Sequence, residues 1–141
     1  MDKGITIYIN AIPTLIEYSE GSTHIVGLMD KPFGAIKSGK KTIEIRANSD
    51  VRPFDYSIVK ANHTLRFINE NSGDIIDTKV IRVVHYPNVR TLFEIEGTEN
   101  TLSVPWTIEK GIEFIHSFPC YKDSIDKYGV YAIEIDVYST V

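Results

Sequence analysis

Alternating apolar and polar residues predict a chain built mainly from β-strands. The alternating stretches are rich in β-branched and aromatic residues, which favour strands. The stretch 80–84 is apolar enough to predict a fully buried strand segment, and Asn71-Ser72-Gly73-Asp74 predicts a hairpin turn. The predicted strands span residues 4–10, 24–29, 40–46, 62–69, 78–86 and 129–138.

One helix is predicted between the second and third of these strands. It would span residues 31–38 and end at Gly39. Asp30 has the chemistry of an N-cap residue, because its carboxylate can accept a hydrogen bond from a free backbone N–H of the first turn. Pro32 lies in that first turn, where a missing N–H does little harm.

Other segments predict shorter elements. Apolar residues at three- and four-residue intervals predict helices between residues 89 and 128, and Pro105 and Pro119 would break them into short pieces. Nearer the start, residues 13–18 predict a helical turn and residues 19–23 a loop.

Strands separated by turns and interrupted by short helices indicate the α+β class and a small mixed β-barrel. The order lacks the strand–helix–strand alternation that is typical of a parallel sheet. A length of 141 residues with 43% hydrophobic residues is typical of one domain with one core. We therefore expect one compact unit.

The charge distribution restricts the classes of ligand. A net charge of −4 and a pI near 5.5 argue against a protein that coats nucleic acid indiscriminately, because that affinity comes from neutralising many phosphates. Basic residues cluster between residues 31 and 52, whereas acidic residues dominate from Glu94 onward. Any contact with nucleic acid is therefore expected to be local.

Cysteine usage and hydropathy place the chain in the cytoplasm by default. Cys120 is the only cysteine, which excludes an intramolecular disulfide and a cysteine-based zinc site. No apolar run approaches the ~18 residues that span a bilayer, so no membrane association is expected. The histidines lack metal-ligand spacing, and no pattern predicts a cofactor or a metal.

Candidate chemistry is concentrated in the predicted strand at residues 40–46. Ile43 and Ile45 share one face of a regular strand. The opposite face would carry a polar row of both signs, made of Lys40, Thr42, Glu44 and Arg46. Such a row could bind an anion.

This segment resembles the signature of the ASCH family, a branch of the PUA-like superfamily, which reads Gly-x-Lys-x-x-Glu-x-Arg. The matching residues are Gly39, Lys41, Glu44 and Arg46. The likeness extends over residues 24–137, through the strand at 24–29, the helix at 31–38 and the closing strand at 128–135. In a regular strand Lys41 would lie opposite Glu44 and Arg46, so the match requires a bend at Gly39.

The resemblance implies a PUA-like pseudo-barrel with a cleft beside the signature strand that binds RNA, a nucleoside or a nucleotide. Arg46 would grip a phosphate or a base edge, and Lys41 would supply a point charge. Glu44 would accept from a base amino group or orient Lys41, while Lys40 ranks lower because the family spacing selects Lys41. The nearby aromatics Phe33, Phe54 and Tyr56 are expected in the core.

Two enzymatic alternatives remain open. Some ASCH-like proteins are amidohydrolases that deacetylate N4-acetylcytidine with a lysine of this signature and a threonine three residues on. Lys41 matches that lysine, but Glu44 occupies the threonine position, so the nucleophilic hydroxyl is missing. The second alternative is a ribonuclease in which Lys41 or Glu44 is the base and Arg46 stabilises the phosphorane.

One further segment departs from the family pattern, and another is expected to border the cleft. Asn62 and His63 occupy the positions of a Gly-Asp pair found in many ASCH domains. Asn62 tolerates a left-handed backbone, and His63 is expected to be a surface turn residue. Trp106 is expected to seal an edge of the core, and residues 104–120 to form a wall of the cleft.

The N-terminal segment suggests a third class of function. We expect residues 1–23 to form a strand extension packed on an ASCH-like domain of residues 24–141. The strand at 4–10 could pair with an exposed sheet edge of this chain or of a partner, as in a protein-interaction module. The sequence leaves the oligomeric state open.

Overall fold

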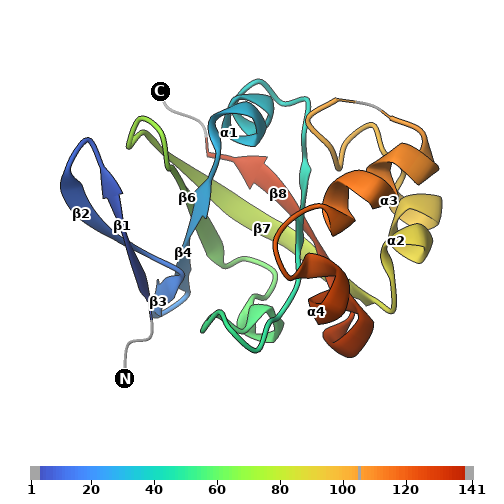
Figure 1. The fold of residues 1–141 in the computed structure, drawn as a ribbon. Coiled ribbons are helices and arrows are strands. Elements are labelled where there is room, and N and C mark those ends of the chain that lie inside the picture. Colours follow the sequence, from blue (N-terminus) through green and yellow to red (C-terminus); the bar gives the residue numbers. More distant parts are fainter. Residues whose placement is uncertain (1–3, 105, 139–141) are drawn as a thin grey trace.

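The computed structural model describes residues 4–104 and 106–138 and places them in the α+β class, as predicted. Its larger sheet has six strands in the order β3-β4-β6-β7-β8-β5, and only the β4–β6 pair is parallel (Figure 1). These strands are β3 (Tyr18–Glu20), β4 (Thr23–Leu28), β5 (Ile43–Arg46), β6 (Thr64–Asn69), β7 (Ile75–Tyr86) and β8 (Val130–Val137). The helices are α1 (Asp30–Lys37), α2 (Val89–Glu96), α3 (Ile108–His116) and α4 (Tyr121–Tyr128), with a short 3₁₀ helix η1 (Tyr56–Ile58).

The six-stranded sheet is not a closed barrel, which corrects that part of the expected architecture. β3 and β5 are its two edge strands. The short strand β3 pairs with the first half of β4, and the backbone N–H of Glu17 donates to the carbonyl of Ile25 on the same edge. β5 pairs only with β8 in the described structure, so the sheet stays open between β5 and the edge formed by β3 and the second half of β4.

A separate hairpin precedes the sheet. β1 (Ile5–Ile9) pairs antiparallel with β2 (Ile12–Ile16), which corrects the predicted helical turn at residues 13–18. The reason is the two-residue turn: Asn10 and Ala11 both have positive φ angles, of 50° and 65°, as a type I′ hairpin turn requires. Part of the predicted loop at residues 19–23 is the strand β3.

Three apolar clusters hold these elements together. One lies inside the curled sheet beneath α1 and contains Phe33, Phe54 and Tyr56, which confirms that these rings are core residues. A second packs β5 and β8 against α2, α3 and α4 on the other side (Figure 1). The third joins the hairpin to β4 and β6 through Ile9, Ile16, Ile25 and Ile68.

Several local expectations are also corrected. Met29 is the N-cap position of α1 and Asp30 is its first helical residue; the Asp30 carboxylate instead accepts a hydrogen bond from the Asn69 amide, at 3.1 Å. Strand β7 begins at Ile75 and has a bulge between Val80 and Arg82. Ile81 is 41% exposed, so the segment 80–84 is not fully buried.

The predicted helices between residues 89 and 128 are present as α2, α3 and α4. Pro105, residues 1–3 of the expected extension and residues 139–141 of the expected domain lie outside the described residues. In the part of the chain that the structure describes, no helix is long and apolar enough to cross a membrane.

Candidate ligand-binding cleft

The signature segment is a turn followed by a short strand, and this changes where Lys41 points. Gly39 has a φ of +84°, and the backbone N–H of Lys41 donates to Ala35 of α1. Thr42 and Ile43 both donate from their backbone N–H to Asn100, so regular sheet pairing starts only at Ile43. Lys41 is therefore free of the strand alternation that would separate it from Glu44 and Arg46.

Lys41, Glu44 and Arg46 form a continuous buried ionic cluster. Lys41 Nζ lies 3.3 Å from Glu44 Oε1, and Arg46 Nε donates to Glu44 Oε2 at 2.6 Å. The side chains of Lys41 and Glu44 are 6% exposed and that of Arg46 is 11% exposed. The structure thus brings three of the four expected site residues together, while Lys40 is exposed in the turn between α1 and β5.

The Lys41 amine has a partner in each direction in which it can donate. It donates to the backbone carbonyls of Ile43, at 2.8 Å, and Thr101, at 2.6 Å, and its third neighbour is Glu44. An ammonium group has three N–H donors. Lys41 is therefore held by the protein itself, and it links the start of β5 to the segment after α2.

Arg46 connects β5 to two other parts of the fold. Its Nη1 donates to the Tyr56 hydroxyl at 3.2 Å, and its Nη2 donates to the backbone carbonyl of Gly27 in β4 at 2.8 Å. Together with the bond to Glu44, these contacts use three of the five N–H groups of a guanidinium. The other two N–H groups are the donors that Arg46 can offer to a ligand.

The electrostatics of the cluster favour an anion. Burial alone would raise the pKa of Glu44, but Arg46 and Lys41 together hold that pKa below its usual value. Burial lowers the pKa of Lys41, against the opposing effect of Glu44. The pKa of Arg46 is raised well above its usual value by Tyr56 and Glu44, although burial acts in the other direction. With all three groups ionised, the cluster carries one excess positive charge.

Two side chains beside this cluster were missed by the sequence reasoning. Glu17 is 2% exposed, has a φ of +58° and forms an ion pair with Arg52, whose side chain is half-exposed. Tyr121 at the start of α4 has its pKa raised by burial, while the Arg46 and Arg52 cations and a hydrogen bond with the Ala47 backbone act to lower it. Glu17 and Tyr121 come from elements distant from β5 in sequence, so no local pattern could have indicated them.

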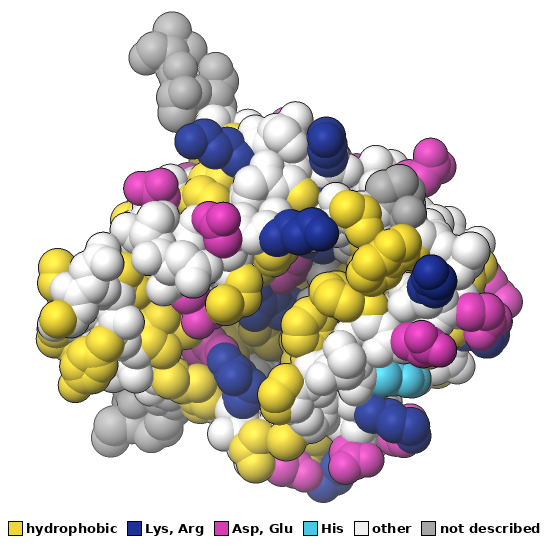
Figure 2. Space-filling view, turned by 45° about the horizontal axis from the view of Figure 1, so that its top comes forward, with side chains coloured by type: hydrophobic (Ala, Val, Ile, Leu, Met, Phe, Trp, Pro, Cys, Tyr) yellow, Lys and Arg dark blue, Asp and Glu magenta, His cyan; other side chains and the backbone are white. Residues whose placement is uncertain are grey.

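A hollow occupies the middle of the face drawn in Figure 2. Basic and acidic side chains lie in its floor, and apolar side chains border it on both sides. Figure 2 is turned about the horizontal axis from Figure 1, so the hollow lies between the side of the molecule that carries β1 and β2 and the side that carries α3 and α4. We refer to the region around Arg46, where Tyr56 accepts its hydrogen bond and Tyr121 packs beside β5, as the β5 cleft.

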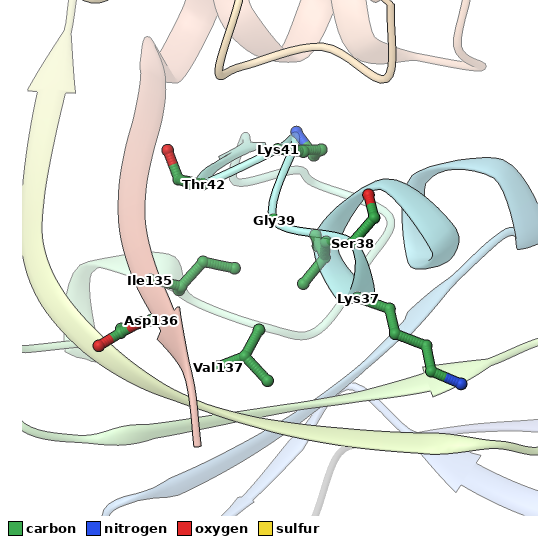
Figure 3. A pocket seen from close by; sticks show the side chains of 9 residues that line it. Lys37, Ser38, Gly39, Lys41, Thr42, Ile135, Asp136 and Val137 are labelled. Carbon is green, nitrogen blue, oxygen red and sulfur yellow. The ribbon is translucent and has the colours of Figure 1, made fainter. Parts of the chain in front are cut away.

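A separate small pocket of about 190 Å³ lies between the end of α1 and β8. Its lining includes signature residues, but Figure 3 shows Ile135 and Val137 pointing into it while the amines of Lys37 and Lys41 point away. Because the cationic groups face elsewhere, this pocket does not have the chemistry that the signature suggests for an anion.

A pair of histidines lies next to Phe54, whose ring packs against Tyr56. His24 is 1% exposed; its Nε2 lies 2.8 Å from His63 Nδ1, and its Nδ1 lies 2.7 Å from the Ser19 hydroxyl. Because Lys60 N–H donates to His63 Nδ1, that atom is an acceptor and His24 Nε2 is the donor. Burial and the neighbouring His63 lower the pKa of His24 to about 4.

The structure tests the expectations for the neighbouring residues Asn62 and His63. Asn62 has a φ of +73°, which confirms the left-handed turn. His63 is partly buried and bonded to His24, which corrects the expectation of a simple surface residue. Within residues 4–104 and 106–138, no group of three His, Cys, Asp or Glu side chains could hold a metal ion.

Comparisons with known proteins show the family and similar folds. The chain is similar to a hypothetical protein, PH0355, whose crystal structure superposes with a TM-score of 0.66 at 29% identity, covering 79% of this chain and 95% of that one. It is also similar to protein PF0455 from Pyrococcus furiosus, solved by NMR, with a TM-score of 0.61 at 29% identity, covering 81% of this chain and 96% of that one. A comparison with curated proteins found no match. The family model of the ASCH domain matches residues 26–139, and the chain therefore belongs to the ASCH domain family.

Proposed function

We propose that the β5 cleft binds a nucleotide, either free or as part of an RNA chain, through a phosphate that Arg46 contacts. The proposal rests on the hydrogen bonding of the Arg46 guanidinium. Its guanidinium is fixed by Glu44, Tyr56 and Gly27, yet two of its N–H groups have no assigned partner among the described residues. A fixed guanidinium binds phosphate oxygens well because its donors are already oriented.

The charge of the cluster supports the same proposal. Lys41 and Arg46 share one carboxylate, so a bound phosphate would offset the excess positive charge of a site that is only 11% exposed at Arg46. In this role Glu44 and Lys41 position Arg46 and do not contact the ligand. Lys40, exposed in the turn before β5, would contribute only a long-range charge. The proposal includes a PUA-like ancestry for the curled sheet and a cytoplasmic location for the protein.

The hydrolase and ribonuclease alternatives receive less support from the geometry. A lysine base or nucleophile needs a free lone pair that can reach the substrate. Lys41 Nζ is buried and donates to two carbonyls in addition to its contact with Glu44. Glu44 is likewise bound to both cations, so neither group is available without rearrangement of the cluster.

A titration of fluorescently labelled single-stranded RNA, followed by polarisation, tests the proposal. Arg46→Lys keeps the charge but removes the planar fork, so we expect at least about tenfold weaker binding and weaker competition by nucleoside monophosphates. Arg66→Lys is the matched control, because Arg66 is also paired with a carboxylate, Asp77, but is 39% exposed in β6. Unchanged affinity in a folded Arg46→Lys protein, or no binding by the unmodified protein, would overturn the proposal.

A further inference from the structure

Four aromatic side chains form a row of edge-to-face contacts on the surface of α3 and α4. Adjacent ring centroids lie 5.1 Å apart for Trp106–Phe114, 5.0 Å for Phe114–Phe118 and 5.7 Å for Phe118–Tyr121. Trp106 and Phe114 are each 36% exposed and Phe118 is 40% exposed. Trp106 therefore does not seal the core as expected, and we call these four residues the aromatic row.

The row is built by the way that α3 meets α4. Gly111 and Ile115 face the core from α3, which leaves Phe114 toward solvent. Phe118 follows Phe114 by four residues, and Cys120, with a φ of +66°, reverses the chain so that α4 begins with Tyr121 next to Phe118. The Thr98 hydroxyl donates to the Trp106 carbonyl at 2.5 Å and holds the far end in place.

Charged side chains lie near both ends of the row. At the Trp106 end, an open groove of about 390 Å³ is lined by Trp106, Lys110, Glu113 and Phe114. At the other end, Tyr121 packs against the apolar cluster that contains Ile45 and Ala47, the residues on either side of Arg46 in β5. The row thus runs from the groove beside Lys110, over the exposed rings of Trp106, Phe114 and Phe118, to the partly buried Tyr121 at the β5 cleft.

We propose that the aromatic row binds a single-stranded nucleic acid whose bases stack on its exposed rings and whose chain continues into the β5 cleft. This inference rests on the proposed function of that cleft. Rings that present free π surface between cations are the features that sequence-tolerant single-strand binding uses. A repeating chain of bases and phosphates complements both the rings and the positive charge at the Arg46 end, whereas an apolar peptide would complement only the rings.

The single tryptophan of this chain makes the row directly observable. A 12-residue oligouridine added to the full chain should quench Trp106 fluorescence, because a stacked base contacts the indole. Phe118→Ala should weaken oligonucleotide binding about tenfold, which is within the range for loss of one stacked base. The same substitution should leave binding of a nucleoside monophosphate unchanged, because Phe118 lies outside the cleft.

The matched control is Tyr8→Ala, since Tyr8 is 68% exposed on β1 and lies outside the row. Equal binding of oligouridine and oligothymidine would identify stacking as the shared contact, and a preference for oligouridine would add contacts to the 2′-hydroxyl. An unquenched Trp106, or equal oligonucleotide affinity for Phe118→Ala and Tyr8→Ala, overturns the proposal that the aromatic row binds nucleic acid. If nucleoside monophosphates still bind in that case, the proposed function of the β5 cleft is retained.

A competing occupant would be a second copy of this chain. Light scattering that shows concentration-dependent dimers, lost in Phe118→Ala and insensitive to oligouridine, would assign the row to self-association and overturn the proposal. Conversely, quenching of Trp106 that persists with unchanged affinity in Arg46→Lys would count against the cleft and would overturn the proposal that the chain continues into it.

Discussion

Arg46 on β5 donates a hydrogen bond from Nη2 to the backbone carbonyl of Gly27 on β4, at 2.8 Å, and so joins two strands that are not neighbours in the sheet. The carbonyls of Ile25 and Gly27 point to the same edge of β4, because carbonyl direction alternates along a strand. Ile25 accepts from Glu17 there, and Gly27 accepts from Arg46. The side chain therefore occupies the gap where a closed barrel would have a strand pair.

Replacement of Arg46 by Ala should destabilise the protein strongly. It leaves the buried Glu44 with only Lys41 as a cationic partner and removes the link to Gly27. Breaking a buried ion pair on one side costs about 3 to 5 kcal/mol. Urea denaturation of the two proteins should show a loss in this range, whereas Arg66→Ala should cost no more than about 1 kcal/mol. A loss for Arg46→Ala as small as for Arg66→Ala would show that the bridge is not structural.

The adjacent lysines provide a second matched pair. Lys41→Met removes the N–H donors from two buried carbonyls and a buried carboxylate around Nζ, at a cost of about 1 to 3 kcal/mol for each group left without a partner. Lys40→Met changes an exposed side chain and should alter stability by less than about 0.5 kcal/mol. Thermal unfolding followed by circular dichroism distinguishes the two. Equal midpoints for both variants would contradict the structural role of Lys41.

His24 predicts a pH dependence of stability in the mildly acidic range. Its folded-state pKa is lowered from 6.5 to about 4, so the unfolded state binds the proton first as the pH falls. The free energy of unfolding should therefore decrease from about pH 6.5 to about pH 4, by up to about 3 kcal/mol from this group. Urea denaturation at a series of pH values measures the slope.

The variant His24→Gln should flatten that slope, and His116→Gln serves as a histidine control on α3. An unchanged slope in His24→Gln would assign the pH dependence to other groups. The buried carboxylate of Glu44 acts at lower pH, since its lowered pKa contributes stability that is lost only as the pH falls below its usual titration range.

Local patterns predicted the elements whose periodicity was strong. The strands around Ile25, Leu65 and Ile133 and the helices after Pro87 follow from alternation and from three- and four-residue spacing. The hairpin at residues 5–16 was only half predicted, because the Asn10-Ala11 turn lacks the glycine that usually marks positive φ. Lys41 does not follow the alternation of a regular strand, because a contact distant in sequence delays the start of β5. The backbone carbonyl of Asn100 accepts hydrogen bonds from the N–H groups of Thr42 and Ile43, the two residues after Lys41.

The residues of the candidate site also fall into two groups, those that a local pattern indicated and those that only the folded chain brings together. Lys41, Glu44 and Arg46 were found because they lie within six residues and match a family spacing. Tyr121, Gly27 and Thr101 complete their surroundings through contacts made only by the folded chain. Burial of the ionic cluster could not be predicted from the segment alone, because a strand with alternating charges is usually assigned to a solvent-exposed face.

The most direct measurement of the central claim is an NMR titration of the isotope-labelled protein with a nucleoside monophosphate. The account predicts that backbone amide shifts concentrate at Gly27, Ala47 and Tyr121, which surround Arg46, and that Arg46→Lys weakens the titration while Arg66→Lys does not. Absence of shifts, or shifts confined to residues away from the β5 cleft, would contradict it.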